Sequence, residues 1–91
     1  MTIDGFQKKI KEIYLKKDTE RGIEGTFTWF VEEIGELARA VRNGQNVKEE
    51  LADCAAWLFS IANITNISME DAVGKYKNEC PKCRKIPCIC D

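Results

Sequence analysis

The feature that most limits how this chain can fold is residues 51–65, LADCAAWLFSIANIT, in which Asp53 is the single charged residue. On a helix, this stretch places apolar side chains on nearly every side, so it needs cover on more than one face. The chain has only 91 residues, and a chain of that length builds a thin core by itself. We therefore expect a second subunit to complete the fold, giving a dimer or a tetramer.

Four helices and no strands are predicted along the chain. Helical spacing of apolar residues places the helices at 3–17, 26–43, 46–65 and 69–78, with a mobile loop at 18–25. Thr26 or Thr28 would cap the second helix, and Gly44 would end it. Asn46 would cap the third helix, and Ser68 the fourth. The predicted fold class is all-α, a four-helix bundle over residues 1–79 followed by a Cys-rich tail at 80–91.

Composition excludes several classes of function. The chain has 14 basic and 15 acidic residues, a net charge of −1, which argues against a dedicated nucleic-acid or anionic-membrane binder. No apolar run is long enough to span a membrane and the N-terminus does not resemble a signal peptide, so we expect a cytoplasmic protein. The chain has no histidine. Any metal must therefore be held by carboxylates or by cysteines.

Carboxylates gather on the second and third predicted helices. Glu32 and Glu36 lie opposite the apolar stripe of the second helix and Glu33 lies at its flank, which by itself describes a solvated acidic face. Glu50 and Asp53, however, head an apolar stripe of the third helix, where a carboxylate is costly unless it is paired or binds a cation. A salt bridge from Asp53 to a lysine is the alternative. The stripe of the second helix consists of Phe27, Phe30, Val31, Ile34, Leu37, Ala38 and Val41.

The turn near residues 43–45 is short, so the second and third helices should pack antiparallel and bring the two acidic groups level. Oxygen ligands without histidine suit a hard cation such as Mg²⁺ or Mn²⁺. Mg²⁺ held by a few carboxylates usually works alongside the phosphates of a substrate. The pattern therefore predicts a cation site that serves a phosphorylated ligand.

EEIGE at residues 32–36 and ELAD at residues 50–53 resemble the EExxE…ExxD signature of the MazG-like nucleotide pyrophosphohydrolases, which are all-α NTP pyrophosphatases. VEEIGELARAV and DCAAWLFSIANITNISMEDAVGKYKNECP are similar to the helices of that family. The resemblance implies an Mg²⁺-dependent enzyme that converts (d)NTP to (d)NMP and pyrophosphate, in nucleotide housecleaning. It leaves open a deoxynucleotide-specific or phosphoribosyl-ATP pyrophosphatase. A non-enzymatic helical adaptor with a zinc knuckle is an alternative of another class.

The resemblance also implies roles for single residues. Glu32 would be a further metal ligand or would orient the attacking water. Lys75 and Asn78 would contact the substrate. The metal ligands would be Glu33, Glu36, Glu50 and Asp53. Apart from the resemblance, Trp29 and Trp57 are aromatic side chains that either stack on a base or belong to the core.

The tail carries its own motif, C-x2-C-x4-C-x-C, formed by Cys80, Cys83, Cys88 and Cys90. Such short paired spacing in a cytosolic chain favours a tetrahedral thiolate site, and we expect a structural Zn²⁺. Disulfides and an unstructured thiol tail are the alternatives. Cys54, in the third helix, is expected to be a small buried apolar residue rather than a nucleophile.

Overall fold

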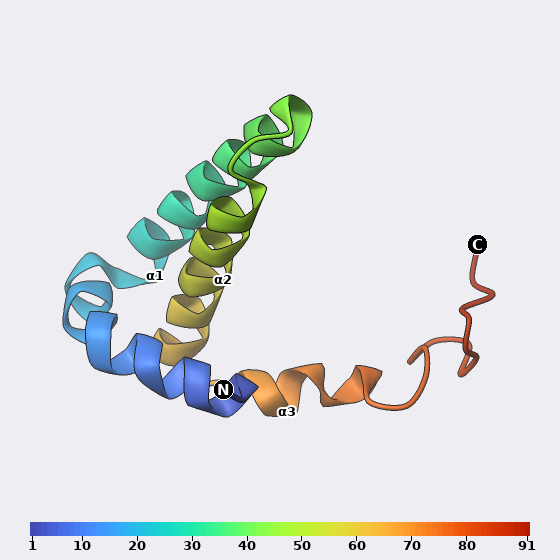
Figure 1. The fold of residues 1–91 in the computed structure, drawn as a ribbon. Coiled ribbons are helices and arrows are strands. Elements are labelled where there is room, and N and C mark those ends of the chain that lie inside the picture. Colours follow the sequence, from blue (N-terminus) through green and yellow to red (C-terminus); the bar gives the residue numbers. More distant parts are fainter.

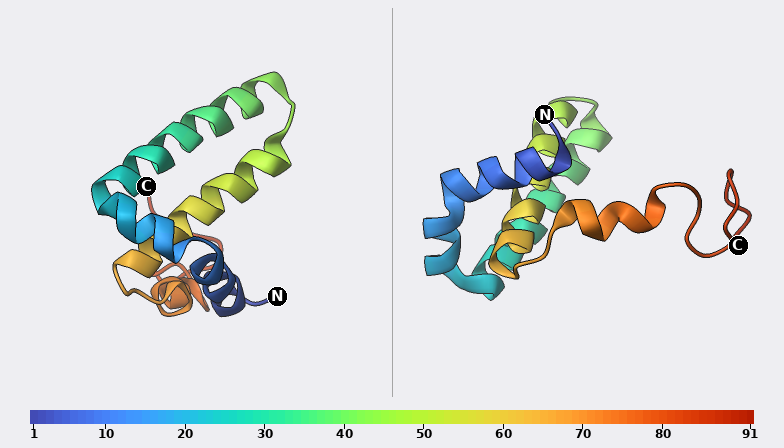
Figure 2. Two further views of the ribbon diagram at one scale, coloured as in Figure 1. Left: turned by 90° about the vertical axis from the view of Figure 1, so that its left-hand side faces the viewer. Right: turned by 90° about the horizontal axis from the view of Figure 1, so that it is seen from below.

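The computed structural model describes residues 1–91 and contains helices without any strand, so the all-α prediction is confirmed. Helix α1 spans Ile3–Asn43, α2 spans Val47–Ile64, α3 spans Met69–Val73, and a 3-10 turn, η1, covers Gly74–Tyr76. The C-terminal part of α1 runs antiparallel to α2, and its N-terminal part crosses the end of α2 (Figures 1 and 2). Helix α3 and the tail extend away from this pair.

Helix α1 bends at Gly22 into a first arm (residues 3–21) and a second arm (residues 23–43). Gly22 has φ 80° and ψ 172°, a combination that is open to glycine almost alone. Both arms are helical up to this residue, so the predicted loop at 18–25 is wrong. Thr26 and Thr28 do not cap a helix, because both lie inside the second arm: the buried Thr26 hydroxyl has no hydrogen-bond partner, and the Thr28 hydroxyl donates to the Glu24 carbonyl at 2.9 Å.

Other predicted helix ends agree with the structure. Gly44 ends α1 in the left-handed conformation at φ 68°, and the Ser68 hydroxyl caps α3 by accepting from the Asp71 N–H at 3.2 Å. Asn46 precedes α2 as predicted, but its side chain makes no capping hydrogen bond. The side-chain cap expected from residue type is therefore formed by Ser68 but not by Asn46.

Helix α3 is shorter than predicted. It ends at Val73 and continues only as the 3-10 turn to Tyr76, rather than reaching residue 78. A helix of five residues cannot cover the long α1–α2 pair, so one chain by itself is not a closed four-helix bundle.

A buried polar contact holds the first arm of α1 against the α2–α3 junction. The Gln7 side-chain amide donates to Asn63 Oδ1 at 3.0 Å and to the Ile67 carbonyl at 2.8 Å. Its oxygen accepts from the Met69 N–H at 2.8 Å, and Asn63 returns a bond to the Gln7 carbonyl at 3.3 Å. Because the donors and the acceptor of the Gln7 amide are used, this buried contact stabilises the crossing of the two elements.

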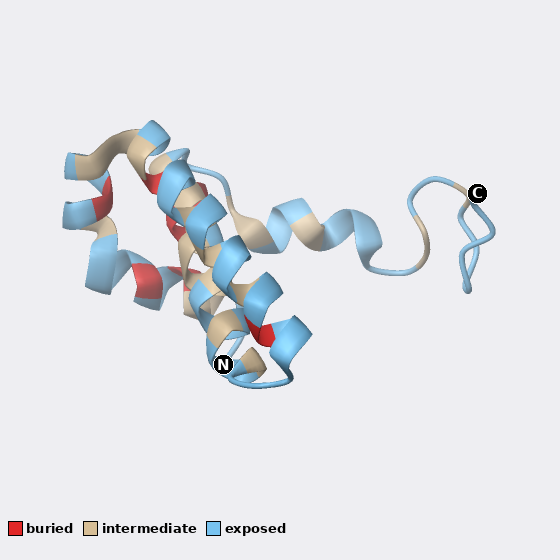
Figure 3. Cartoon of the chain, turned by 90° about the horizontal axis from the view of Figure 1, so that it is seen from above, coloured by how far each residue is buried: buried red, intermediate tan, exposed pale blue.

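The apolar stripe of the second predicted helix is largely exposed. Phe27, Val31, Ile34 and Val41 are between 45% and 60% exposed, and Figure 3 shows how much of the helical surface is accessible. The second arm turns a different side toward α2, the side that carries the buried residues Thr26 and Ala40. Only Ile10, Ala40 and Ala62 form a buried apolar core. No helix is both long enough and apolar enough to cross a membrane.

Candidate metal centre and adjoining pocket

Three carboxylates meet where the second arm of α1 passes the start of α2. Glu33 comes from α1, Glu50 and Asp53 come from α2, and one oxygen of each lies within 4.8 Å of the others. The two helices are also tied at this level, since Cys54 Sγ donates to the Glu33 carbonyl at 3.4 Å. The short turn at Gly44 and the antiparallel packing therefore produce the convergence that the sequence predicted. We call Glu33, Glu50 and Asp53 the acidic cluster.

The acidic cluster carries unbalanced negative charge. None of its members takes part in an ion pair, so the salt bridge considered for Asp53 is not formed. Glu50 Oε2 is buried and has no hydrogen-bond partner. Partial burial, followed by the charges of Asp53, Glu50 and the other nearby glutamates, raises the pKa of Glu33. A buried acceptor oxygen among mutually repelling carboxylates fits a bound divalent cation.

The two remaining predicted carboxylates lie outside this cluster. Glu36 is half exposed, and both its oxygens accept from Arg39 at 3.2 Å. Glu32 is exposed. Both are close enough for their charges to contribute to the raised pKa of Glu33. The structure therefore brings three of the five carboxylates together, and the ligand role of Glu36 and the role of Glu32 remain predictions.

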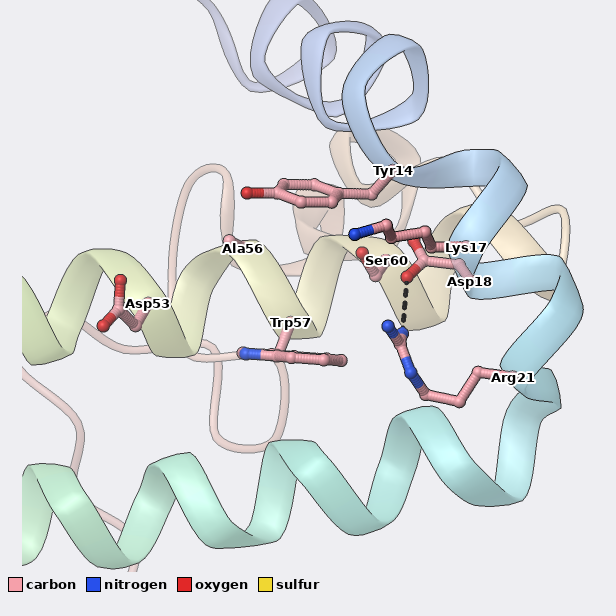
Figure 4. A pocket seen from close by; sticks show the side chains of 8 residues that line it. All are labelled: Tyr14, Lys17, Asp18, Arg21, Asp53, Ala56, Trp57 and Ser60. Carbon is pink, nitrogen blue, oxygen red and sulfur yellow. Dashed lines mark hydrogen bonds and ion pairs between the residues drawn. The ribbon is translucent and has the colours of Figure 1, made fainter.

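A pocket of about 210 Å³ adjoins the acidic cluster and shares Asp53 with it. Figure 4 shows Tyr14 and Trp57 on opposite sides of the pocket, with Asp53 toward one end and a basic group toward the other. The first arm of α1 and helix α2 supply all of its lining residues, which are Tyr14, Lys17, Asp18, Arg21, Asp53, Ala56, Trp57 and Ser60.

Asp18 and Arg21 form the far end of the pocket. The Arg21 guanidinium donates to Asp18 Oδ1 at 2.9 Å and lies 4.8 Å from the centre of the Trp57 ring. The Asp18 side chain is only 2% exposed, and its Oδ2 has no partner. Sequence reasoning missed both residues because it assigned them to a mobile loop. Their spacing of three residues on a continuing helix is the signal that could have found them.

Three of the predicted substrate-binding residues, Trp29, Lys75 and Asn78, do not line this pocket. Trp29 stacks on Trp57 with ring centres 6.3 Å apart and is itself half exposed. Lys75 lies beyond α3, with its ammonium 5.3 Å from the Tyr76 ring, and Asn78 lies beside the tail. Their contact with substrate remains a prediction. Trp57, by contrast, faces the pocket directly (Figure 4).

The four tail cysteines form a second cluster, remote from the first. Their sulfur atoms all lie within 4.8 Å of one another. Hydrogen bonding, chiefly from the Ile89 N–H, lowers the pKa of Cys83 to about 6. Backbone N–H groups of Cys83 and Lys82 likewise lower the pKa of Cys80. The chain thus holds one hard oxygen cluster and one soft sulfur cluster, and each has a donor set able to bind a metal.

A family model describing the MazG nucleotide pyrophosphohydrolase domain matches residues 21–84, well over half of the chain. The chain belongs to this family. The matched segment contains all three members of the acidic cluster, and MazG domains typically use Mg²⁺. No curated protein matches the chain. Membership fixes nucleotides as the expected substrate class, and the roles of individual residues rest on the geometry above.

Replacing Glu33 by glutamine is expected to raise the melting temperature of the metal-free protein at pH 8. The pKa of Glu33 is raised in the folded protein. At a pH above that pKa the ionised carboxylate therefore lowers the free energy of unfolding, and this destabilisation disappears as the pH falls below the folded pKa toward the unfolded value. The gap between variant and wild type should therefore narrow toward pH 5. Thermal melts in EDTA and in Mg²⁺ test this. Addition of Mg²⁺ should raise the melting temperature of the wild type more than that of the glutamine variant. A variant that melts lower than wild type in EDTA at every pH would contradict it.

Proposed function

We propose that this chain is an Mg²⁺-dependent nucleotide pyrophosphohydrolase that converts a nucleoside or deoxynucleoside triphosphate to the monophosphate and pyrophosphate. The observation that carries the proposal is the acidic cluster with the unpartnered buried Glu50 Oε2, which opens through Asp53 onto the pocket. Carboxylate ligands without histidine are the donor set for a cation that works on phosphates. Family membership supports the same conclusion.

The chemistry follows from where charge must be neutralised. Mg²⁺, when bound, supplies charge neutralisation for phosphate oxygens and lowers the pKa of a water. Glu33, Glu50 and Asp53 would hold the ion, with Glu36 as the predicted fourth ligand. Glu32 would orient the water whose oxygen joins the monophosphate as the bond between the α and β phosphates breaks and pyrophosphate leaves. Positioning and charge neutralisation account for most of the catalysis in such transfers.

The pocket is assigned to the nucleoside. Tyr14 and Trp57 offer aromatic faces, and Asp53 at one end lets phosphates reach the acidic cluster. At the other end, Asp18, whose Oδ2 has no partner, would accept from an N–H group at the edge of the base. At about 210 Å³ the pocket is smaller than the roughly 300–1,000 Å³ of most ligand sites. One chain therefore encloses only part of a nucleotide.

A second copy would complete both the fold and the site. The exposed stripe on the second arm of α1, which includes Phe27, Val31 and Ile34, is an apolar surface of the kind that subunits bury. We therefore propose a homodimer or a tetramer. The apolar side chains on nearly every side of residues 51–65 support the same assembly. Lys75 would reach phosphate from a neighbouring subunit, because its own α3 leads away from the acidic cluster (Figure 1).

The proposal is tested by pyrophosphate release from a panel of NTPs and dNTPs, in Mg²⁺ and in EDTA. We expect release that requires Mg²⁺. A folded, oligomeric protein that releases nothing from any member would overturn it. Phosphoribosyl-ATP would then be the next substrate to test, and binding to a basic partner protein would test the adaptor alternative.

A further inference from the structure

The tail contains a cluster of groups that the proposed reaction does not use. Cys80, Cys83, Cys88 and Cys90 lie beyond α3, on a segment that extends away from the helical pair and its acidic cluster (Figures 1 and 2). None of residues 80–91 is buried, so the segment has no apolar core. A peptide this short folds only with a covalent or metal cross-link.

The sulfur positions separate these two kinds of cross-link. Cys80 and Cys90 sulfurs are 3.9 Å apart, and Cys83 and Cys88 sulfurs are also 3.9 Å apart. A disulfide needs about 2.05 Å. Four sulfurs bound at about 2.3 Å to one tetrahedral Zn²⁺ lie about 3.8 Å from each other. These two pairs therefore have the spacing of a thiolate tetrahedron, and all four atoms stay within 4.8 Å.

The backbone folds Cys80 and Cys83, the first pair of cysteines in the sequence, into a closed turn. The Arg84 N–H donates to the Cys80 carbonyl at 2.8 Å, and the Cys80 N–H donates to the Lys85 carbonyl at 3.3 Å. Arg84 adopts the left-handed conformation at φ 59°. A non-glycine residue adopts this conformation only at an energetic cost. Its presence at Arg84 therefore indicates that the turn around the two cysteines holds the backbone in place.

Backbone N–H groups point at the sulfurs. The Ile89 N–H donates to Cys83 Sγ at 3.4 Å, and the Cys90 N–H donates to Cys88 Sγ at 3.2 Å. Such bonds favour sulfur in its negatively charged form, and partners of this kind orient the ligands of metal sites. One sulfur of each sequence pair, Cys83 in the first and Cys88 in the second, therefore accepts a backbone hydrogen bond of the kind that orients a metal ligand.

We propose that residues 80–91 bind one structural Zn²⁺ through Cys80, Cys83, Cys88 and Cys90. Four sulfur donors in a tetrahedron select Zn²⁺ over the hard Mg²⁺ of the acidic cluster. The site is closed to substrate, because all four positions are taken by protein. Zinc then orders the tail without taking part in nucleotide hydrolysis, and the two metal sites of the chain act independently.

The test uses the full chain, reconstituted with zinc under reducing conditions and freed of excess metal. We expect one Zn²⁺ per chain by elemental analysis, and the intense absorption of a tetrahedral thiolate site after replacement with Co²⁺. Cys83→Ser and Cys88→Ser are each expected to weaken zinc binding at least about 100-fold, because even the partners of metal ligands are worth 10- to 100-fold.

Two matched variants locate the site. Cys54→Ser removes the one cysteine outside the cluster, and it should keep the zinc. Glu50→Gln alters the acidic cluster and should also keep it. Cys83→Ser should retain helical content and pyrophosphate release, so failure of the zinc assignment and failure of the proposed enzyme activity are seen separately.

Three results would overturn the proposal. The first is a reduced native chain that binds no zinc and in which all five thiols react freely. The second is a mass lower by four hydrogens, which shows two disulfides among the tail cysteines. The third is zinc that is retained in Cys83→Ser or lost in Cys54→Ser. Iron in place of zinc would overturn the choice of metal.

Discussion

Replacing Glu50 by glutamine is expected to lower Mg²⁺-dependent pyrophosphate release at least about 100-fold, since metal coordination supplies several kcal/mol of transition-state stabilisation and 1.36 kcal/mol is tenfold in rate. Glutamine preserves the length of the side chain and its helix propensity. It removes the charge of the group whose Oε2 is buried without a partner. Initial rates measured over a range of Mg²⁺ concentrations should stay low, because excess cation does not replace the missing ligand.

The matched control is Glu49→Gln. Glu49 is the neighbouring residue in the first turn of α2, is exposed, and belongs to neither metal cluster. The same substitution there should leave the rate unchanged, and circular dichroism should show both variants equally helical. Equal activity of the two variants would show that the acidic cluster does not hold the catalytic cation. That outcome would contradict the proposed function even if the wild type is active.

The acidic cluster was predictable because short-range signals position it. Gly44 has the residue type that ends a helix in the left-handed conformation, and the structure places it there. A short turn after it forces the two helices to run antiparallel, which brings Glu33 level with Glu50 and Asp53. The paired cysteine spacing of the tail was informative for the same reason. In both cases residues close in sequence fix the geometry, so no long-range packing has to be known.

The bend at Gly22 could not be predicted in the same way. The segment at 18–25 has two glycines and four charged residues, a composition typical of loops. One residue with positive φ is enough to redirect a helix, however, and its neighbours remain helical. Tertiary contacts then override the cost of about 1 kcal/mol that glycine imposes on a helix. Because residues 18–25 were predicted to be a loop, Asp18 and Arg21 were not identified as site residues, although both line the pocket.

The apolar stripe of the second arm shows another limit of periodicity. A repeat of apolar residues identifies a helix face that needs cover, but it does not say which partner provides that cover. Phe27, Val31 and Ile34 belong to a regular apolar stripe, yet the second arm turns its Thr26 and Ala40 side to α2 and leaves these three side chains exposed. The same exposure is what supports a second copy in the proposed function.

Replacing Trp57 by alanine is expected to raise KM for the preferred nucleotide between about 5- and 150-fold, because stacking of a base on an aromatic ring is worth about 1–3 kcal/mol. Trp57 faces the pocket opposite Tyr14, under the Arg21 guanidinium (Figure 4). Its ring is not one of the carboxylates that hold the cation, so kcat should change much less than KM. Steady-state kinetics at saturating Mg²⁺ separate the two constants.

Loss of the Trp57 ring also removes its stack with Trp29, so folding has to be controlled for. Trp57→Phe retains an aromatic face and should recover most of the affinity, while both variants should melt cooperatively with wild-type helical content. If phenylalanine restores KM, the effect of alanine on KM cannot be attributed to a general loss of structure. A fall in kcat at unchanged KM, in a variant that remains folded, would instead place the base outside this pocket. The nucleoside assignment would then fail, while the acidic cluster would keep its role.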